Sequence, residues 1–324
     1  MVPLFIAIWF WLIKNKFMLH VIGEILVDTY IEEGKTSIFP GGAPFNVACN
    51  AKNYLDAVSF YGAVGEDKNG QYLLEFAKSR GFNNLKIIPS KETSRAVVSL
   101  DNGERSFRFE RDNGADYLLS LSDIDFSIIK AGDIVHIGSL MLSYKEGVEF
   151  YNSLVSKLRT IKGVKISFDI NYRDDIFPSI EAAKKIFIDA LKQADILKFS
   201  IEELTLLSNK EDILEGLRVL LNKKQVAVVT LGKDGSLLYV NDKLHKVGTI
   251  PLKPVDTTGA GDAFYSYFLS SLVNNPNFIY NNELIQKYLF RCNIVGGIAT
   301  LKKGAIGVAP KEKEIDEFIK QNNL

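Results

Sequence analysis

The sequence predicts an α/β protein in which helices cover both faces of a mostly parallel β-sheet. Short apolar strand segments alternate with longer helical segments along the chain, which is typical of parallel sheets with crossover helices. The strand segments are near-continuous apolar runs, as expected for strands that are buried on both faces. Polar or glycine-rich segments follow several of them, where open α/β sheets bind their ligands.

Strand and helix signals follow one another in order along the chain. The expected strands span residues 18–28, 58–64, 133–138, 165–170, 196–199 and 226–231. The expected helices span residues 44–55, 70–79, 145–161, 179–193, 201–207, 212–221 and 283–301, and the apolar run 263–273 adds another. We see no internal repeat and no linker, so the sequence favours one continuous unit.

Two further segments interrupt this alternation. Residues 95–100 and 104–110 are both strand-like and flank Asp101-Asn102-Gly103, a hairpin signal. Together with residues 29–39 we expect them to form a small antiparallel sheet that stands off the main layer. It is either a simple surface hairpin or a lid, built from about residues 29–39 and 95–111, over a site at the carboxyl edge of the main sheet.

Composition limits the class of protein. The chain has 324 residues, 47% hydrophobic and 24% charged, which is ordinary for a globular protein. Lys+Arg and Asp+Glu both number 39, so no bulk charge attracts nucleic acid. Cys49 and Cys292 are far apart and make no disulfide framework, which favours a reducing, cytoplasmic location. The three histidines have no metal-ligand spacing.

Residues 1–17 form an apolar extension before the expected fold. The apolar run 4–13 is too short to cross a bilayer, which needs about 20 residues. Its positive charges, Lys14 and Lys16, follow the run, whereas those of a signal peptide precede it. Three interpretations remain: a weak membrane-surface anchor, an exposed sticky tail, or an upstream start with Met18 as the natural initiator. We favour the third and expect no stable membrane insertion.

The segment 256–264, DTTGAGDAF, carries the strongest functional signal. Its glycines let backbone N–H groups approach a small anion, and the apolar run that follows places them at a helix N-terminus, where phosphate is favoured. Asp262 falls in the first helical turn, where a carboxylate accepts a proton from an attacking hydroxyl. The combination predicts phosphoryl transfer to an alcohol.

Three weaker segments have both a functional and a purely structural interpretation. Gly41-Gly42 leads into a helix that carries Asn46, whose amide suits a polar ligand, although a plain strand-to-helix turn has the same pattern. Residues 169–173, DINYR, suit a polyhydroxyl or anionic ligand, or else a helix-capping loop. Residues 230–235, TLGKDG, suit a nucleotide, or else a hairpin turn.

Together these motifs resemble the PfkB (ribokinase-like) sugar kinase family from residue 18 to about residue 310. The segments 41–48, GGAPFNVA, and 256–264 carry the resemblance. Others are similar to its fructokinase branch: 23–28, 169–173, 198–204 and 303–306. The resemblance implies a ribokinase-like three-layer α/β/α domain over residues 18–324 with a small β-lid.

The resemblance also implies roles for individual residues. It implies that Asp262 is the base and that Gly259, Ala260 and Gly261 form the anion hole. The implied substrate-binding residues are Asp28, Gly41, Gly42, Asn46, Asn171 and Arg173, and the charge of Arg111 makes it a further candidate. The implied ATP-binding residues are Thr230, Gly232, Gly235 and Asn293. Glu203 would organise Mg²⁺ through water, and Asp256 and Thr258 would help to hold a monovalent cation such as K⁺.

We therefore expect an ATP- and Mg²⁺-dependent sugar kinase that converts D-fructose to fructose 6-phosphate. 2-Keto-3-deoxygluconate kinase is the alternative, because Arg105, Arg108, Arg111 or Arg173 can pair with the carboxylate of that substrate. A non-catalytic sugar or nucleotide sensor on the same fold is a third interpretation, which the intact anion loop and Asp262 disfavour. The expected partner is the small-molecule sugar, with a homodimer through the lid left open and no nucleic acid.

Overall fold

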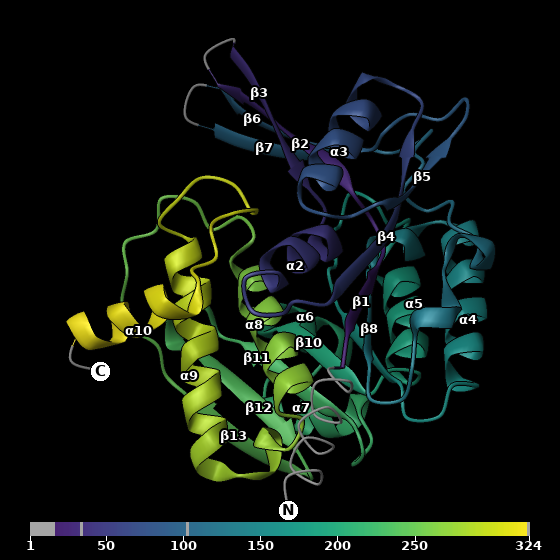
Figure 1. Ribbon diagram of the computed structural model, residues 1–324. Coiled ribbons are helices and arrows are strands. Elements are labelled where there is room, and N and C mark those ends of the chain that lie inside the picture. Colours follow the sequence, from purple (N-terminus) through teal and green to yellow (C-terminus); the bar gives the residue numbers. More distant parts are fainter. Residues whose placement is uncertain (1–16, 33–34, 102–103, 323–324) are drawn as a thin grey trace, which may run out of the picture.

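The apolar strand segments build one large sheet (Figure 1). Within the residues that the computed structural model describes, 17–32, 35–101 and 104–322, this sheet has nine strands in the order β13-β12-β11-β10-β9-β8-β1-β4-β5. Its strands are β1 (Leu19–Ile22), β4 (Val58–Gly65), β5 (Asn84–Ile88), β8 (Ile134–Ile137), β9 (Lys165–Asp169), β10 (Ile196–Ser200), β11 (Val226–Thr230), β12 (Ser236–Val240) and β13 (Lys243–Val247). Neighbouring strands are parallel except at the β11-β12-β13 edge, which is antiparallel.

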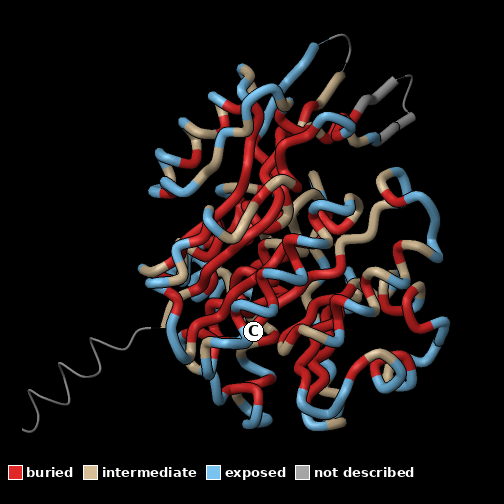
Figure 2. The backbone as a smooth tube through the Cα atoms, turned by 90° about the vertical axis from the view of Figure 1, so that its right-hand side faces the viewer, coloured by how far each residue is buried: buried red, intermediate tan, exposed pale blue. Residues whose placement is uncertain are grey.

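Helices cover both faces of this sheet. They are α2 (Ala43–Ala51), α3 (Lys68–Ser79), α4 (Lys145–Arg159), α5 (Ile180–Leu191), α6 (Ile201–Ser208), α7 (Ile213–Leu220), α8 (Ala260–Asn274), α9 (Asn282–Ala299) and α10 (Glu312–Gln321). Successive side chains of a strand point to opposite faces. Val226 and Val228 of β11 therefore join a core with α2, α8 and α9, while Ala227 and Val229 join the core of α4, α5 and α7. Figure 2 shows the sheet buried between these layers, which confirms the predicted three-layer α/β/α class.

A second, smaller sheet stands off the main layer at the carboxyl ends of its parallel strands (Figure 1). It consists of β2 (Leu26–Glu32), β3 (Lys35–Gly41), β6 (Arg95–Asp101) and β7 (Glu104–Glu110), in the order β3-β2-β6-β7. The hairpins β2-β3 and β6-β7 are antiparallel as predicted, but β2 and β6 pair in parallel. The predicted fully antiparallel sheet is therefore wrong at its centre.

The predicted single strand over residues 18–28 is also wrong, because the chain bends at Gly23 between β1 and β2. Gly23 has a φ of 156°. A Cβ atom there would lie 2.8 Å from the side chain of Pro44 and 3.0 Å from the backbone of Gly138. The bend passes the chain from the main sheet into the small sheet and so brings Asp28 over the carboxyl edge.

The other predicted elements are present with ends that differ by a few residues. The strand β12 fits the hairpin-turn interpretation of residues 230–235, whereas the strands β5 and β13 and the helix α10 were not predicted. Of the predicted extension 1–17, only Phe17 is among the described residues, and it packs against the α2-α8-α9 core. Over the described ranges, no helix combines the length and the apolar character needed to cross a membrane.

Candidate active site

A cavity of about 480 Å³ lies between the small sheet, the carboxyl ends of β10 and β11, and the first turn of α8. It brings together residues that the sequence indicates at separate places along the chain: Asp28, Gly42, Asn46, Asn171, Arg173, Glu203, Thr230, Thr258, Gly259, Gly261 and Asp262. Leu26, Ala96, Phe109 and Leu140 add an apolar wall. The cavity therefore combines polar groups for a hydroxylated ligand with an apolar side that helps to exclude water.

Asp262 lies in the first turn of α8 and lines this cavity. Asn46, on α2, donates from Nδ2 to its Oδ2 at 2.8 Å. Burial raises the pKa of Asp262, while the Asn46 hydrogen bond and the positive charges of Lys198 and Arg173 act to lower it. A raised pKa lies closer to neutral pH, and a general base works best when its pKa is near the working pH.

The loop before Asp262 is shaped for close approach of an anion. Gly259 is the N-cap of α8 with a φ of 73°, and a Cβ atom there would lie 2.4 Å from the Cβ of Ala305. The N–H of Ala260 donates to the carbonyl of Thr257 at 3.3 Å, so it closes the loop itself. The N–H of Gly261 belongs to the first turn, where the helix offers it no acceptor. The loop thus places the Gly261 N–H at the positive end of the helix dipole, whereas the Ala260 N–H is bonded within the loop and does not support the implied place of Ala260 in the anion hole.

Asp28 enters the cavity from β2. Burial, together with the negative charges of Asp262 and Asp256, raises its pKa to about 7, although Arg173 acts to lower it. Gly41 itself is absent from the cavity lining, yet a Cβ atom there would lie 2.3 Å from Oδ2 of Asp28. Gly41 therefore makes room for the Asp28 carboxylate.

The arginines and Asn171 differ in position. Arg173 and Asn171 line the cavity, and Nη1 of Arg173 donates to the carbonyl of Tyr172. Arg111 is absent from the lining and is 3% exposed. It donates from Nη2 to Asp116 at 2.6 Å and from Nη1 to Ser143 at 2.9 Å. The hydrogen bonds of its guanidinium hold the fold, so the structure does not support the expected direct substrate contact of Arg111.

Sequence reasoning missed Lys198. This side chain, on β10, is 7% exposed, lines the cavity and donates to both oxygens of Asp169, at 2.7 and 2.9 Å. Burial lowers the pKa of Lys198, but the carboxylates of Asp169 and Glu203 outweigh it, so that the pKa is raised. A positive charge is thereby fixed beside the anion loop. The signals in the sequence were a lysine near the end of an apolar strand segment and its place at the start of the fructokinase-like segment 198–204, to which no role was assigned.

Of the implied nucleotide-binding residues, Thr230 lines the cavity, whereas Gly232, Gly235 and Asn293 are absent from its lining. Thr230 lines the cavity at the end of β11, and Gly232 faces open space in the turn that follows. Gly235 approaches the loop after β13, because a Cβ atom there would lie 2.1 Å from the carbonyl oxygen of Val247. Asn293 donates to the carbonyls of Val247 and Gly248, at 3.1 and 3.0 Å, so its amide shapes that loop.

The implied cation-binding residues are held by backbone groups. Glu203 lines the cavity and accepts from the N–H of Ser200 at 2.7 Å. Among the described residues, no group of three or more His, Cys, Asp or Glu side chains is arranged to hold a metal. Mg²⁺ usually keeps several waters and binds mainly through substrate phosphates, and Glu203 would hold it through such a water. Asp256 accepts from the Thr258 hydroxyl at 2.7 Å and from the Gly304 N–H at 3.0 Å, which joins the two loops that would enclose a monovalent cation.

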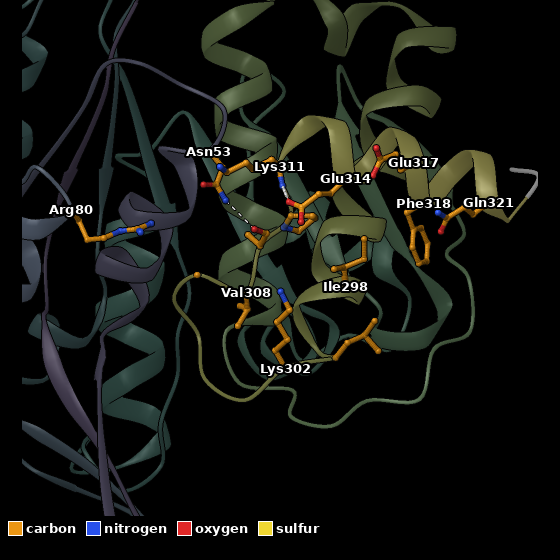
Figure 3. Close-up of a pocket in the computed structure, with 14 residues that line it drawn as sticks. Asn53, Arg80, Ile298, Lys302, Val308, Lys311, Glu314, Glu317, Phe318 and Gln321 are labelled. Atoms are coloured by element: carbon orange, nitrogen blue, oxygen red, sulfur yellow. Dashed lines mark hydrogen bonds between the residues drawn. The ribbon is translucent and has the colours of Figure 1, made fainter.

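A second cavity, of about 450 Å³, lies beside α9 and α10 (Figure 3). It contains none of the residues that the sequence indicates. Arg80, Lys302, Lys311, Glu314 and Glu317 give it charges of both signs, and four of these five side chains are exposed. It therefore offers no charge selectivity comparable with that of the first cavity.

An anion loop at a helix N-terminus, a buried carboxylate beside it and a polar cavity under a separate small sheet define the class of protein as a small-molecule kinase. The model of the pfkB family carbohydrate kinases matches residues 17–312. This chain belongs to that family, and it is a sugar kinase.

The chain is similar to several fructokinases. It is 35% identical to the probable chloroplastic fructokinase-6 of Arabidopsis thaliana over 311 residues, which cover 92% of this chain and 81% of that protein. A fructokinase from Vibrio cholerae O395, solved as a double mutant with fructose, ADP and a potassium ion, matches with a TM-score of 0.85 at 30% identity and covers 94% of this chain and 98% of that one. A fructokinase from Xylella fastidiosa with bound ATP gives 0.86 at 26%, covering 96% of this chain and 100% of that one.

Proposed function

We propose that this protein transfers the γ-phosphate of ATP to D-fructose and forms fructose 6-phosphate. The observation that carries the proposal is the position of Asp262, which stands beside the anion loop and accepts a hydrogen bond from Asn46 inside the cavity. Asp28 and Asn171 face the same cavity and supply hydrogen-bonding groups for the other hydroxyls of a neutral sugar. The fructose-bound relative supports the choice of sugar.

In the proposed reaction, Asp262 accepts the proton of the sugar hydroxyl while that oxygen attacks the phosphorus. The N–H groups of Gly259 and Gly261 stabilise the charge on the transferred group. Glu203 would hold Mg²⁺ through water, and the metal would neutralise charge on the phosphates. The small sheet acts as a lid that keeps out water, which would otherwise compete as the acceptor.

The charges around the cavity favour a neutral sugar over 2-keto-3-deoxygluconate. Of the arginines that could pair with a carboxylate, Arg111 is bonded to Asp116 and Arg108 to Glu110. The side chain of Arg105 lies outside the described residues. Among the candidate arginines whose side chains the structure describes, only Arg173 lines the cavity, and the same lining contains the acids Asp28, Glu203 and Asp262.

A panel of sugars assayed for ADP formation tests the proposal. We expect kcat/KM for D-fructose to exceed the values for 2-keto-3-deoxygluconate and ribose, because missing hydroxyls leave buried polar groups unpaired. The Arg173→Ala variant is the control, and it should reduce use of the acid sugar more than use of fructose if both are accepted. If the wild-type enzyme preferred 2-keto-3-deoxygluconate, that acid would replace fructose as the proposed substrate.

We also propose that K⁺ supports activity through the loop of Asp256 and Thr258, and that the lid sheet provides a homodimer contact. The potassium-bound relative supports the first part. On β3, Ile38 and Phe39 are 42% and 37% exposed, which supports the second, because exposed apolar groups favour association. The first part is tested by replacing K⁺ with tetramethylammonium in the assay. The second part is tested by light scattering of an Ile38→Ser/Phe39→Ser variant.

A further inference from the structure

Lys198 and Asp169 form a buried ion pair across two neighbouring strands. The residues are direct partners in the parallel register of β9 and β10, so both side chains leave the sheet on the same face. The ammonium contacts both carboxylate oxygens, at 2.7 and 2.9 Å, and the two side chains are 9% and 4% exposed. Such a pair gives a fold little net stability, because desolvation of both charges offsets their attraction.

The ammonium of Lys198 lies at the anion loop. A Cβ atom placed on Gly261 would lie 3.4 Å from its Cε and 3.6 Å from its Nζ. Lys198 also lines the same cavity as Asp262, and its positive charge acts on the pKa of that carboxylate. The lysine head group is therefore placed within reach of any anion that binds at the first turn of α8.

The ammonium has a donor to spare for such an anion. A lysine has three N–H donors, and the hydrogen bonds of Lys198 within the described residues go to the two oxygens of Asp169. The cavity lining itself contains three acids, Asp28, Glu203 and Asp262, and a triphosphate adds further negative charge. A fixed cation at the loop offsets this charge where it is largest.

We propose that Lys198 is a catalytic residue that donates a hydrogen bond to the phosphoryl group during its transfer, and that Asp169 is the positioning residue that orients it. The inference rests on the proposed kinase function. In the step, the bond from phosphorus to the bridging oxygen of ADP breaks, the bond to the sugar oxygen forms, and the hydroxyl proton goes to Asp262. Lys198 transfers no proton and stabilises charge on the non-bridging oxygens, as preorganised donors do.

The test compares variants by nucleotide binding and by turnover. Calorimetric titration with MgATP and with MgADP reports contact with the γ-phosphate without requiring any sugar. For Lys198→Met we expect an affinity for MgATP lower by about tenfold, an affinity for MgADP within about threefold of wild type, and kcat lower by about 10²–10³. Loss of the affinity for both nucleotides to the same extent would overturn the proposed contact.

The double variant Lys198→Met/Asp169→Asn separates catalysis from folding. It removes both charges of the pair, so that neither partner is left buried without the other, and we expect it to keep the melting temperature of the wild type while kcat stays as low as in Lys198→Met. Recovery of wild-type kcat would show that the pair is only structural. The control is the ion pair of Lys86 and Asp123, which lies outside the cavity. Its Nζ and Oδ2 atoms are 2.8 Å apart. Its double variant Lys86→Met/Asp123→Asn should keep wild-type kcat.

These readouts also distinguish failure of the proposed function from failure of the role of Lys198. A wild-type protein that bound no MgATP would refute the kinase function and the role of Lys198 with it. A protein that bound MgATP but phosphorylated a sugar other than fructose would refute only the substrate. The ATP-to-ADP comparison would then still decide the role of Lys198.

Discussion

Three elements converge on Asp262, the proposed base. The first turn of α8 supplies its backbone, α2 supplies the Asn46 hydrogen bond at 2.8 Å, and β10 supplies the positive charge of Lys198. Asparagine at position 262 would keep an acceptor for Asn46 but could not take up a proton. We expect Asp262→Asn to lower kcat by about 10²–10⁴ while the affinity for the sugar changes little.

Steady-state kinetics combined with titration of the sugar measures this effect. Asp189→Asn is a suitable control, because Asp189 is an exposed acid on α5 that is absent from the cavity lining. It should leave both quantities unchanged. A near-normal kcat in Asp262→Asn would remove this carboxylate from the base role.

We expect Asp28 to make activity depend on pH near neutrality. Its pKa is raised to about 7 by burial first and by Asp262 and Asp256 second. In the free enzyme, kcat/KM for the sugar should therefore fall as the pH drops through about 7, because the cavity carboxylates take up protons. In Asp28→Asn one negative neighbour of Asp262 is gone, so the acidic limb should move to lower pH.

Profiles of kcat/KM between pH 5 and pH 9 for the two proteins test this expectation, and the position of the limb matters rather than its height. An acidic limb at the same pH in both proteins would show that Asp28 does not influence the base.

The raised pKa of Asp28 also makes the stability of the fold depend on pH, in the opposite direction to the activity. The contribution of Asp28 to the free energy of unfolding is fully present below about pH 4 and is lost as the pH rises through about 7.

Some of these residues could be recognised from sequence and others could not. Asp262 and its loop are contiguous, so the sequence alone shows an anion site beside a base. The role of Lys198 depends on the register of β9 with β10, which pairs residues 29 positions apart. Arg111 was expected at the sugar because its charge is visible in the sequence, whereas its burial against Asp116 depends on the folded loop.

At the scale of elements, the bend between β1 and β2 positions the lid sheet over the site. This bend contains Glu24, which is fully buried. Burial is the main cause that raises the pKa of Glu24 to about 8. The negative charge of Asp116 adds to the rise, while Arg111 and the backbone act to lower it. Glu24 therefore carries a proton at neutral pH in the folded protein but not in the unfolded one.

The sign of the effect on stability follows from this difference. The contribution of Glu24 to the free energy of unfolding is fully present below about pH 4.5 and is lost as the pH rises through about 8. The loss amounts to at most about 1.4 kcal/mol per pH unit. Because Glu24→Gln cannot ionise, we expect this variant to gain melting temperature relative to wild type between pH 6 and pH 9.

Calorimetry at several pH values measures the difference. Glu317→Gln, on the exposed face of α10, is the control and should follow the wild-type curve at every pH. Parallel curves for Glu24→Gln and wild type would contradict a protonated Glu24 in the folded state.

The bend at Gly23 is one feature of the elements that the sequence did not predict. Residues 18–28 are apolar enough for one strand, and only the close packing of Gly23 against Pro44 and Gly138 divides them. The parallel pairing of β2 with β6 joins segments that are more than 60 residues apart in the sequence, which no local pattern specifies. The buried strands of the main sheet were predicted because their apolar character is local and needs no knowledge of partners.

At the scale of the whole molecule, two cores on opposite faces of one sheet hold the site at the carboxyl edge. The helices α2 and α8 belong to the same core, and they carry Asn46 and Asp262. The relative positions of these two residues therefore depend on packing that reaches to the opposite end of the sheet, where β1 begins. Phe17 and Met18 lie at that end.

The start of the folded unit can be located from these contacts. The sequence predicts that removal of residues 1–17 leaves folding and kinase activity intact, but Phe17 packs against the α2-α8-α9 core and its ring meets Gly132. The N–H of Met18 donates to Asp133 at 2.8 Å, a bond that a chain starting at Met18 can still make. We expect a chain that starts at Met18 to be active yet less stable than one that starts with Met-Phe17, by about 1 kcal/mol for the lost ring. Denaturant unfolding of the two truncated proteins, with the full chain as reference, measures the difference, and equal stability would show that the folded unit starts at Met18.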